Sequence, residues 1–157
     1  MDARLSYFDN DITMKFAKYI NSAGAVVTGS SLPAATQELV KLRASQINGC
    51  AFCTDMHIKD ALAAGESQQR INLVAVWRES PVFTDAERAA LELAEQGTRI
   101  ADAAGGVTDE AWQNAAKYYD EDQLMALVGV IGLINLYNRF NVITQQPAGA
   151  YQPGQFG

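Results

Sequence analysis

Two cysteines and a histidine lie close together before the middle of the chain. Cys50 and Cys53 are three residues apart, and His57 follows Cys53 by four residues. Since a helix turns by about 100° per residue, the three side chains would fall within roughly 60° of one another. The spacing therefore predicts one helical stripe that carries both thiols and the only imidazole of the chain.

The position of this stripe within its helix favours reactive thiols. The turn residues Asn48 and Gly49 precede Cys50, so we expect a helix that begins at Cys50 and ends at Gly65. Unpaired amides and the helix dipole stabilise a thiolate in a first turn, and the thiolate is the nucleophilic form of cysteine. The spacing also permits a reversible disulfide.

Glu38 is the most plausible partner of the imidazole. It precedes Cys50 by twelve residues, within a helix that we expect from Pro33 to Ile47. If the Glu38 face packs against the cysteine stripe, the carboxylate can accept a hydrogen bond from His57 and fix its tautomer. Ser45, two turns after Glu38 on the same face, is expected to be structural.

The elements that must position these residues are all helical. Strand patterns are poor, whereas helical spacing and helix caps recur along the chain, including a capping box at Thr84 and Glu87. We predict an all-α domain of about six to seven helices. Besides the two helices above, the expected ranges are 11–21, 67–77, 84–101, 108–118 and 123–141, the last capped by Asp120 or Asp122.

Composition indicates one soluble domain. The chain has 157 residues, of which 48% are hydrophobic, and a formal charge of −6 without a Lys/Arg cluster. We therefore expect a single domain over residues 1–157, with an irregular tail at 145–157, and no nucleic-acid partner. The first residues lack a signal peptide, and the apolar stretch Leu124–Leu136 is too short to span a bilayer. These features predict a cytoplasmic protein without a membrane partner, where a close cysteine pair is more often redox-active or metal-binding than structural.

The motif Glu38-x11-Cys50-Ala-Phe-Cys53-x3-His57 resembles the core motif of the alkylhydroperoxidase D-like (AhpD-like) proteins of the carboxymuconolactone decarboxylase superfamily. The likeness covers about residues 35–141 and includes Trp77–Thr84 and Asn138–Arg139. The resemblance implies an all-α fold that assembles as a trimer or hexamer and reduces hydroperoxides without a cofactor. It also implies a thiol or dithiol reductant, such as a lipoyl protein.

Carried over to this chain, the resemblance makes Cys53 the attacking thiol and Cys50 the resolving thiol. His57 and Glu38 would form a proton relay. One position departs from the best-known peroxidase of the family, which has a histidine directly before the second cysteine. Phe52 occupies that position here, so that one proton donor or acceptor is missing.

Other functions are compatible with the same residues. Cys50, Cys53, His57 and Glu38 could bind zinc, although ligands from so few turns rarely close a tetrahedron. A carboxymuconolactone decarboxylase-type lactone enzyme would need a general acid or base and an oxyanion site but not two thiols. A general disulfide oxidoreductase and a helical scaffold protein with vestigial residues are further alternatives.

Overall fold

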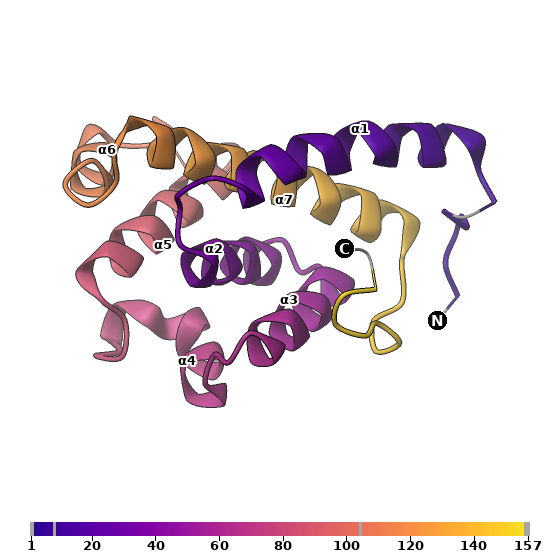
Figure 1. Ribbon diagram of the computed structural model, residues 1–157, viewed down its shortest axis with the longest axis horizontal. Coiled ribbons are helices and arrows are strands. Elements are labelled where there is room, and N and C mark those ends of the chain that lie inside the picture. The colour runs from indigo at the N-terminus through magenta and orange to yellow at the C-terminus, as the bar shows by residue number, and fades with distance from the viewer. Residues whose placement is uncertain (1, 8, 104, 156–157) are drawn as a thin grey trace.

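The computed structural model describes residues 2–7, 9–103 and 105–155. In these ranges the chain forms seven α-helices and one 3₁₀ helix, and no strand (Figure 1), which confirms the all-α prediction. The helices are α1 (Asp11–Thr28), α2 (Ala34–Ile47), α3 (Ala51–Ala63), α4 (Gln68–Leu73), η1 (Val74–Glu79), α5 (Asp85–Thr98), α6 (Asp109–Ala115) and α7 (Glu121–Thr144).

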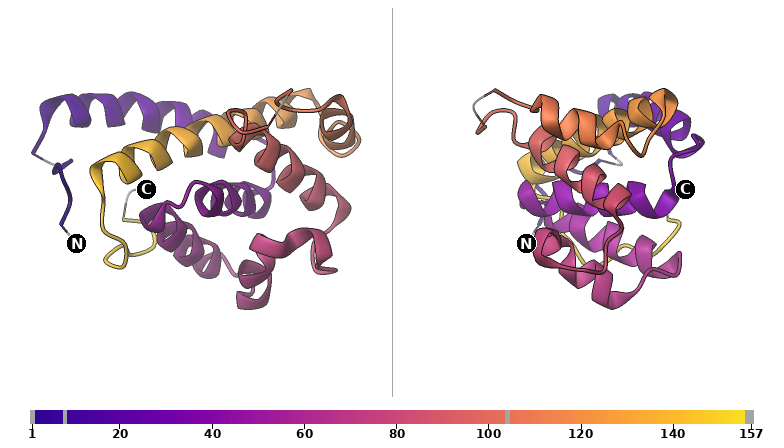
Figure 2. Two further views of the ribbon diagram at one scale, coloured as in Figure 1. Left: turned by 180° about the vertical axis from the view of Figure 1, so that it is seen from behind. Right: turned by 90° about the vertical axis from the view of Figure 1, so that its left-hand side faces the viewer.

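The helix α2 lies at the centre of the molecule. It packs against α3, α5 and α7, while α1 lies along α7 on the opposite side from α3 (Figures 1 and 2). Its side chains enter two core clusters, Val40 with α5 and α7, and Leu39 and Leu42 with Trp77 of η1. Burial of each such aliphatic side chain contributes about 1.5–3 kcal/mol, so α2 holds the layers on either side in place.

The junction between α2 and α3 is a tight turn that sets the direction of α3 relative to α2. Gly49 has a positive φ of 64°, and its N–H bonds to the carbonyl of Gln46 at 3.3 Å. The next amide, that of Cys50, bonds to the carbonyl of Ser45 at 3.0 Å. This pair of bonds is a Schellman motif, which closes α2 at the predicted Asn48–Gly49 turn. It leaves Cys50 as the N-cap of α3 rather than its first helical residue.

Several predicted helix ends are confirmed and others are wrong. The capping box of Thr84 and Glu87 is present, and Asp120 rather than Asp122 caps α7. The helix predicted at 84–101 ends at Thr98, and the helix predicted at 67–77 divides into α4 and η1, with non-helical φ/ψ angles at Val76. The β-branched residues Val74 and Val76 have a lower helix propensity, which favours a break here.

The long helices α1 and α7 extend beyond their predicted ends at residues 21 and 141. Gly24 and the β-branched residues after it disfavour a helix locally, but α1 continues to Thr28 because Val27 packs against the core. A Cβ atom added at Gly129 of α7 would lie 2.8 Å from Val27 Cγ2. The close approach of the two helices therefore depends on this glycine.

By length and composition, α7 is the one described helix that could cross a membrane. A core helix of a soluble protein meets the same test. In this molecule α7 packs against α1, α2, α3 and α5, and its buried residues include Leu127, Val130 and Ile131. These contacts account for its apolar composition and agree with the predicted buried helix at Leu124–Leu136.

The described part of the predicted irregular tail, residues 145–155, contains neither helix nor strand. It folds back from α7 over α3 (Figure 1). Lys59 of α3 donates to the carbonyls of Gly149 and Tyr151, both at 3.0 Å, and Asp55 accepts from the Gly149 amide at 3.0 Å. Hydrogen bonds from α3 thus hold a segment that has no regular structure.

Candidate active site

Both thiols are buried at the start of α3. Cys50 is 1% exposed and Cys53 is fully buried, and neither forms a disulfide. The Sγ atom of Cys50 accepts the backbone N–H of Cys53 at 3.3 Å and so occupies the place of the usual N-cap oxygen. Ala44 and Ile134 complete the small apolar cluster around the sulfurs.

Two asparagines of α7 provide polar contacts to the sulfurs. Asn141 Nδ2 donates to Cys53 Sγ at 3.1 Å. Asn138 donates to Ser45 Oγ at 3.1 Å, and its side chain also hydrogen-bonds to both thiols. Ser45 is structural, as expected, because its hydroxyl donates to the Lys41 carbonyl of its own helix at 2.8 Å.

The two thiols differ in acidity. The hydrogen bond from the Cys53 thiol lowers the pKa of Cys50, and the backbone amides of Cys53 and Phe52 act in the same direction against burial. The same thiol–thiol bond, with burial and the charge on Cys50, raises the pKa of Cys53. Of the two thiols, Cys50 is therefore the one that loses its proton more readily.

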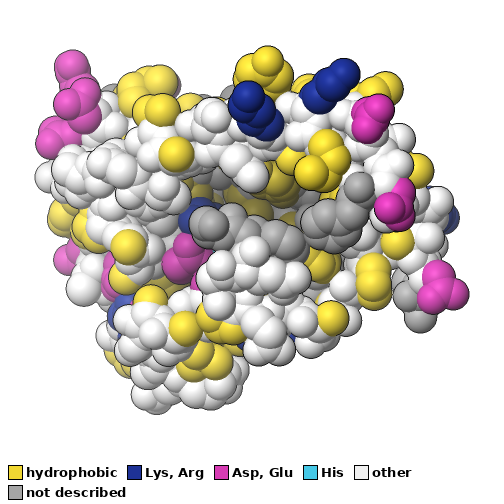
Figure 3. Space-filling model, turned by 45° about the vertical axis from the view of Figure 1, so that its right-hand side comes forward, with side chains coloured by type: hydrophobic (Ala, Val, Ile, Leu, Met, Phe, Trp, Pro, Cys, Tyr) yellow, Lys and Arg dark blue, Asp and Glu magenta, His cyan; other side chains and the backbone are white. Residues whose placement is uncertain are grey.

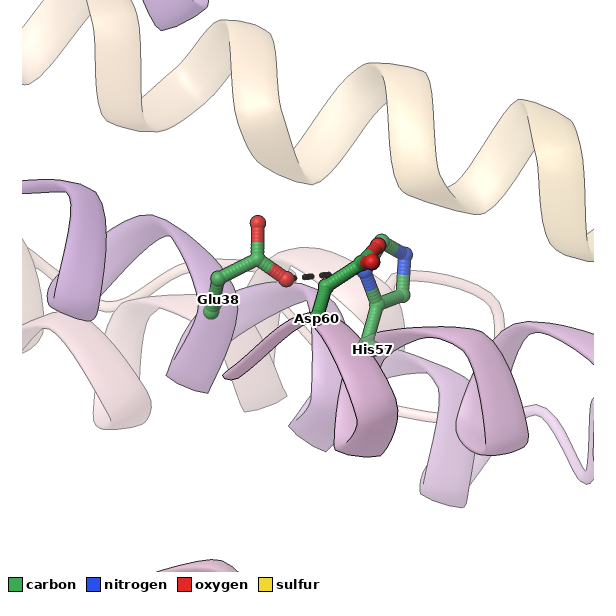
Figure 4. Close-up of side chains that lie close together, drawn as sticks. All are labelled: Glu38, His57 and Asp60. Carbon is green, nitrogen blue, oxygen red and sulfur yellow. Dashed lines mark hydrogen bonds and ion pairs between the residues drawn. The ribbon is translucent and has the colours of Figure 1, made fainter. Parts of the chain in front are cut away.

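The predicted contact between Glu38 and His57 is present. Glu38 of α2 reaches toward α3, and its Oε2 lies 2.9 Å from His57 Nδ1 (Figure 4). Lys41 Nζ donates to the other carboxylate oxygen at 2.7 Å. Burial opposes ionisation of Glu38, but the hydrogen bonds and charges of His57 and Lys41 prevail and lower its pKa to about 2. The carboxylate is therefore ionised and accepts the Nδ1–H of the imidazole.

This contact leaves the second nitrogen of His57 available for proton transfer. The side chain is 6% exposed, and among the described residues Nε2 has no hydrogen-bond partner. With Nδ1–H directed to Glu38, Nε2 is the ring nitrogen through which His57 can exchange a proton. Cys53, four residues earlier on α3, is a neighbour on the same helical face. The His57–Cys53 proton transfer stays a prediction, because the described contacts include no hydrogen bond between them.

Asp60 and Tyr151 extend the site in a way that the sequence did not indicate. Potential ligand atoms of Glu38, His57 and Asp60 all lie within 4.8 Å of one another (Figure 4). Tyr151, on the tail, donates its hydroxyl to Asp60 Oδ1 at 2.7 Å and is 5% exposed. Burial, together with the Asp60 hydrogen bond and charge, raises the pKa of Tyr151 to about 12. The tail thus covers the outer side of the Glu38–His57 pair.

The predicted zinc ligand set does not converge. Among the described residues, the group that could surround a metal consists of Glu38, His57 and Asp60 and contains neither sulfur. A metal bound through Nδ1 would also replace the hydrogen bond between His57 and Glu38. The donor atoms therefore do not fit the Cys50, Cys53, His57 and Glu38 site expected from the motif.

A small apolar pocket of about 240 Å³ lies between α2 and α3 beside Glu38. Its walls include Ala34, Leu39, Ala61 and Ala64. A larger, more polar pocket of about 600 Å³ is lined by residues of η1, α5 and α6 and by none of the four predicted site residues. Of the four predicted site residues, Glu38 forms part of the wall of the smaller pocket.

The chain matches the model of the carboxymuconolactone decarboxylase family over residues 15–96. This range contains Glu38, both cysteines and His57, whereas Asn138, Asn141 and Tyr151 lie beyond it. The uncharacterized protein YdfG of Bacillus subtilis (strain 168) is 39% identical over 142 residues, which are 90% of this chain and 94% of YdfG.

Two solved structures are also similar. A protein of unknown function from Agrobacterium tumefaciens, described in relation to the antioxidant defence protein AhpD, superposes with a TM-score of 0.87 at 36% identity. The match covers 96% of this chain and all of that one. The debrominase Bmp8, in complex with 2,3,4-tribromopyrrole, gives a TM-score of 0.75 at 20% identity over 88% of this chain and 75% of Bmp8. At that identity the likeness concerns the fold alone.

Proposed function

Because the chain belongs to the carboxymuconolactone decarboxylase family and has an AhpD-like fold, we propose that it is a thiol-dependent peroxidase. In this proposal it reduces hydroperoxides through a dithiol/disulfide cycle of Cys50 and Cys53. The observation that carries the proposal is the cysteine pair at the N-terminus of α3, in which the Cys53 amide donates to Cys50 Sγ, with the Glu38–His57 pair one turn away. A lactone decarboxylase would have no need of this thiol pair.

The contacts between the thiols suggest how Cys53 can attack although Cys50 loses its proton more readily. Transfer of the Cys53 proton along the thiol–thiol hydrogen bond to Cys50 would move the negative charge to Cys53. The Cys53 thiolate then attacks the terminal oxygen of the hydroperoxide and breaks the O–O bond. Cys53 becomes a sulfenic acid, and the alkoxide leaves as the alcohol with a proton from water, which His57 relays through Nε2.

In the resolving step, Cys50 reacts with the sulfenic acid of Cys53 to form the disulfide. Cys50 loses its proton to the imidazole, and its thiolate attacks the sulfur of the Cys53 sulfenic acid. The S–S bond forms, and hydroxide leaves as water with a proton from His57. One hydroperoxide and two thiols thus give one alcohol, one water and one disulfide, which an external thiol or dithiol, such as a lipoyl protein, reduces again.

Mass spectrometry of the peptide that contains both cysteines tests this cycle. One equivalent of cumene hydroperoxide should remove about two hydrogens from the peptide, and dithiothreitol should restore them. Formation of the alcohol in equal amount separates peroxide reduction from general disulfide exchange. Persistent sulfinic acid on one cysteine beside a free second thiol would contradict the resolving role.

We also propose a homo-oligomer, which the family resemblance implies as a trimer or hexamer. The outer face of α1 exposes Ile12, Tyr19 and Val26, at intervals of seven residues, to 72–77%. Figure 3 shows hydrophobic side chains gathered along the upper edge of the molecule, where α1 lies. A second copy that covers this stripe would remove it from water.

Light scattering tests the assembly. The mass should be a multiple of the 17.0 kDa chain, and Ile12→Glu with Val26→Glu should reduce it. Asp9→Lys changes charge at an exposed position just before α1 and serves as the control. A wild-type mass of one chain at micromolar concentration would contradict the proposal.

A further inference from the structure

Asn141 makes a direct contact with the sulfur that attacks in the proposed cycle. Its Nδ2 donates to Cys53 Sγ at 3.1 Å, across 88 residues of sequence. The side chain is 6% exposed and lies near the end of α7, beyond the range that matches the family model. An amide so placed offers a neutral hydrogen-bond donor to sulfur without burial of a second charge.

A tyrosine from the opposite end of the chain orients this amide. The Tyr7 hydroxyl donates to Asn141 Oδ1 at 3.1 Å and lies 3.1 Å from Thr144 Oγ1. The segment before α1 is tied to the same place, because the Arg4 N–H bonds to the Thr144 carbonyl at 2.8 Å. With its oxygen engaged by Tyr7, the Asn141 amide directs its N–H toward Cys53.

The neighbouring asparagines of α7 use their amides differently. Asn135 donates to Thr98 Oγ1 at 3.1 Å and to the Ile131 carbonyl at 2.9 Å. Asn138 accepts from Asn48 and divides its donors between Ser45 and the thiols. Asn138 thus shares its amide with Ser45, whereas Asn141 directs its amide to Cys53 and lowers the pKa of that thiol more than Asn138 does.

We propose that Asn141 is a further catalytic residue, whose amide stabilises the negative charge that arrives on Cys53, and that Tyr7 is its positioning residue. The inference rests on the proposed function, in which that charge develops by proton transfer to Cys50. A donor already aligned before the charge moves needs no reorganisation during the step. The resting acidities agree with this role: the bond to Cys50 and burial raise the pKa of Cys53, and the Asn141 bond opposes that rise.

The test measures the pH dependence of Cys53 alkylation by iodoacetamide in a Cys50→Ser background, where it is the single thiol. Asn141→Asp replaces the donor with a negative charge. It should raise the pH midpoint of Cys53 alkylation by about one pH unit or more and slow alkylation about tenfold at neutral pH. Asn141→Leu should produce a smaller shift in the same direction. Tyr7→Phe, at a half-buried position that tolerates the change, should slow alkylation about threefold.

Two matched controls isolate the effect. Asn135→Asp makes the same chemical change on the same helix, and Tyr137→Phe removes a tyrosine–asparagine hydrogen bond that is directed to Asn21 and away from the sulfurs. Both should leave the midpoint within about 0.3 units of the background protein. If folded Asn141→Asp gives the same profile as Asn135→Asp, the role of Asn141 is excluded. If Tyr7→Phe gives the same profile as Tyr137→Phe, the positioning role of Tyr7 is excluded.

The readout separates this inference from the proposed function. Alkylation needs no peroxide. If the pH midpoint of Cys53 alkylation shifts in the variants but the protein does not reduce hydroperoxides, the effect of Asn141 on Cys53 is supported and the peroxidase function is rejected. Hydroperoxide reduction with an unshifted midpoint would retain the peroxidase and reject Asn141. If both the peroxidase function and the role of Asn141 hold, Asn141→Asp should form the Cys53 sulfenic acid more slowly. The decrease should be proportional to the decrease in its alkylation rate.

Discussion

The junctions α2–α3 and α3–α4 share the same backbone turn. Each closes its first helix with a glycine of positive φ, Gly49 at 64° and Gly65 at 91°. In each, the amide after the glycine bonds to a carbonyl five residues earlier, at 3.0 Å for Cys50 and 2.9 Å for Glu66. The backbone alone therefore does not distinguish a reactive junction from a structural one.

The junctions differ in the atom that caps the second helix. Ser67 Oγ caps α4 at the surface, whereas Cys50 Sγ caps α3 in the interior and accepts a hydrogen bond from a second thiol. A hydroxyl keeps its proton at any physiological pH, but a thiol at a helix N-terminus can lose it. The first junction is therefore distinguished by a sulfur in the capping position and by its burial beside Cys53.

Exchange of the two capping atoms should have the largest effect. Cys50→Ser converts the first junction to the type of the second, and we expect complete loss of multiple turnover with a stability change within about 1 kcal/mol, since serine is a good N-cap. Peroxide should then leave a sulfenic acid on Cys53 that dimedone traps. Ser67→Cys should gain an alkylatable surface thiol and leave turnover unchanged. The assignment is wrong if dimedone labels Cys50 in the Cys53→Ser variant and does not label Cys53 in the Cys50→Ser variant. Cys50 would then be the attacking thiol and Cys53 the resolving one.

Loss of the relay should have the next largest effect, and only at the first junction. His57→Ala and Glu38→Gln each remove an acid–base partner and should slow hydroperoxide reduction on the order of tenfold to a thousandfold. Stopped-flow measurement of peroxide consumption gives the rate. Glu66→Gln, which removes the carboxylate that pairs with Arg70 at the second junction, is the matched control. An equal loss of rate in the control would show that these variants act through the fold.

Glu38 should also make stability depend on pH. Its folded-state pKa of about 2 lies below its ordinary value, so its stabilisation is fully present above pH 5 and is lost as pH falls toward 2. We expect Glu38→Gln to lower the free energy of unfolding by about 2 kcal/mol at pH 7 and by progressively less in acid. Urea unfolding at several pH values measures the difference. A difference that stays constant with pH would mean that the carboxylate charge contributes nothing.

The glycines should show the smallest effect. Nothing lies within 4 Å of a Cβ atom added at Gly49 or Gly65, so alanine at either position incurs only the strain of a positive φ. We expect each variant to lose about 1 kcal/mol of stability in thermal or urea unfolding. Only Gly49→Ala should also slow alkylation of Cys50, because it disturbs the turn that places the sulfur at the cap. Equal alkylation rates in both variants would contradict this link.

Much of the site follows from local sequence. The Asn48–Gly49 turn, the three-residue spacing of the cysteines and the helical spacing of His57 all act within about three helical turns. Within that span, backbone geometry determines which side chains share a face. The contact of Glu38 with His57 was also predicted, because two helices joined by a tight turn must pack against each other.

The locally ambiguous helix ends depended on packing. The β-branched end of α1 is a poor helix by propensity, yet contact with α7 through Val27 and Gly129 preserves it. In contrast, the break at Val76 falls where the chain must turn Trp77 into the core. Propensity differences of a few tenths of a kcal/mol are smaller than the burial energies that decide such cases.

Sequence alone predicted an all-α protein with two thiols at one helix junction and an imidazole paired with a carboxylate beside it. Tertiary structure decided which thiol loses its proton more readily and what surrounds the two sulfurs. Asn141 and Asn138 come from α7, and Tyr151 comes from an irregular tail, at separations of 88, 93 and 91 residues from their partners at the site. The spacing of residues within a helix cannot predict contacts at such separations, because they form only after the helices have packed and brought distant segments together.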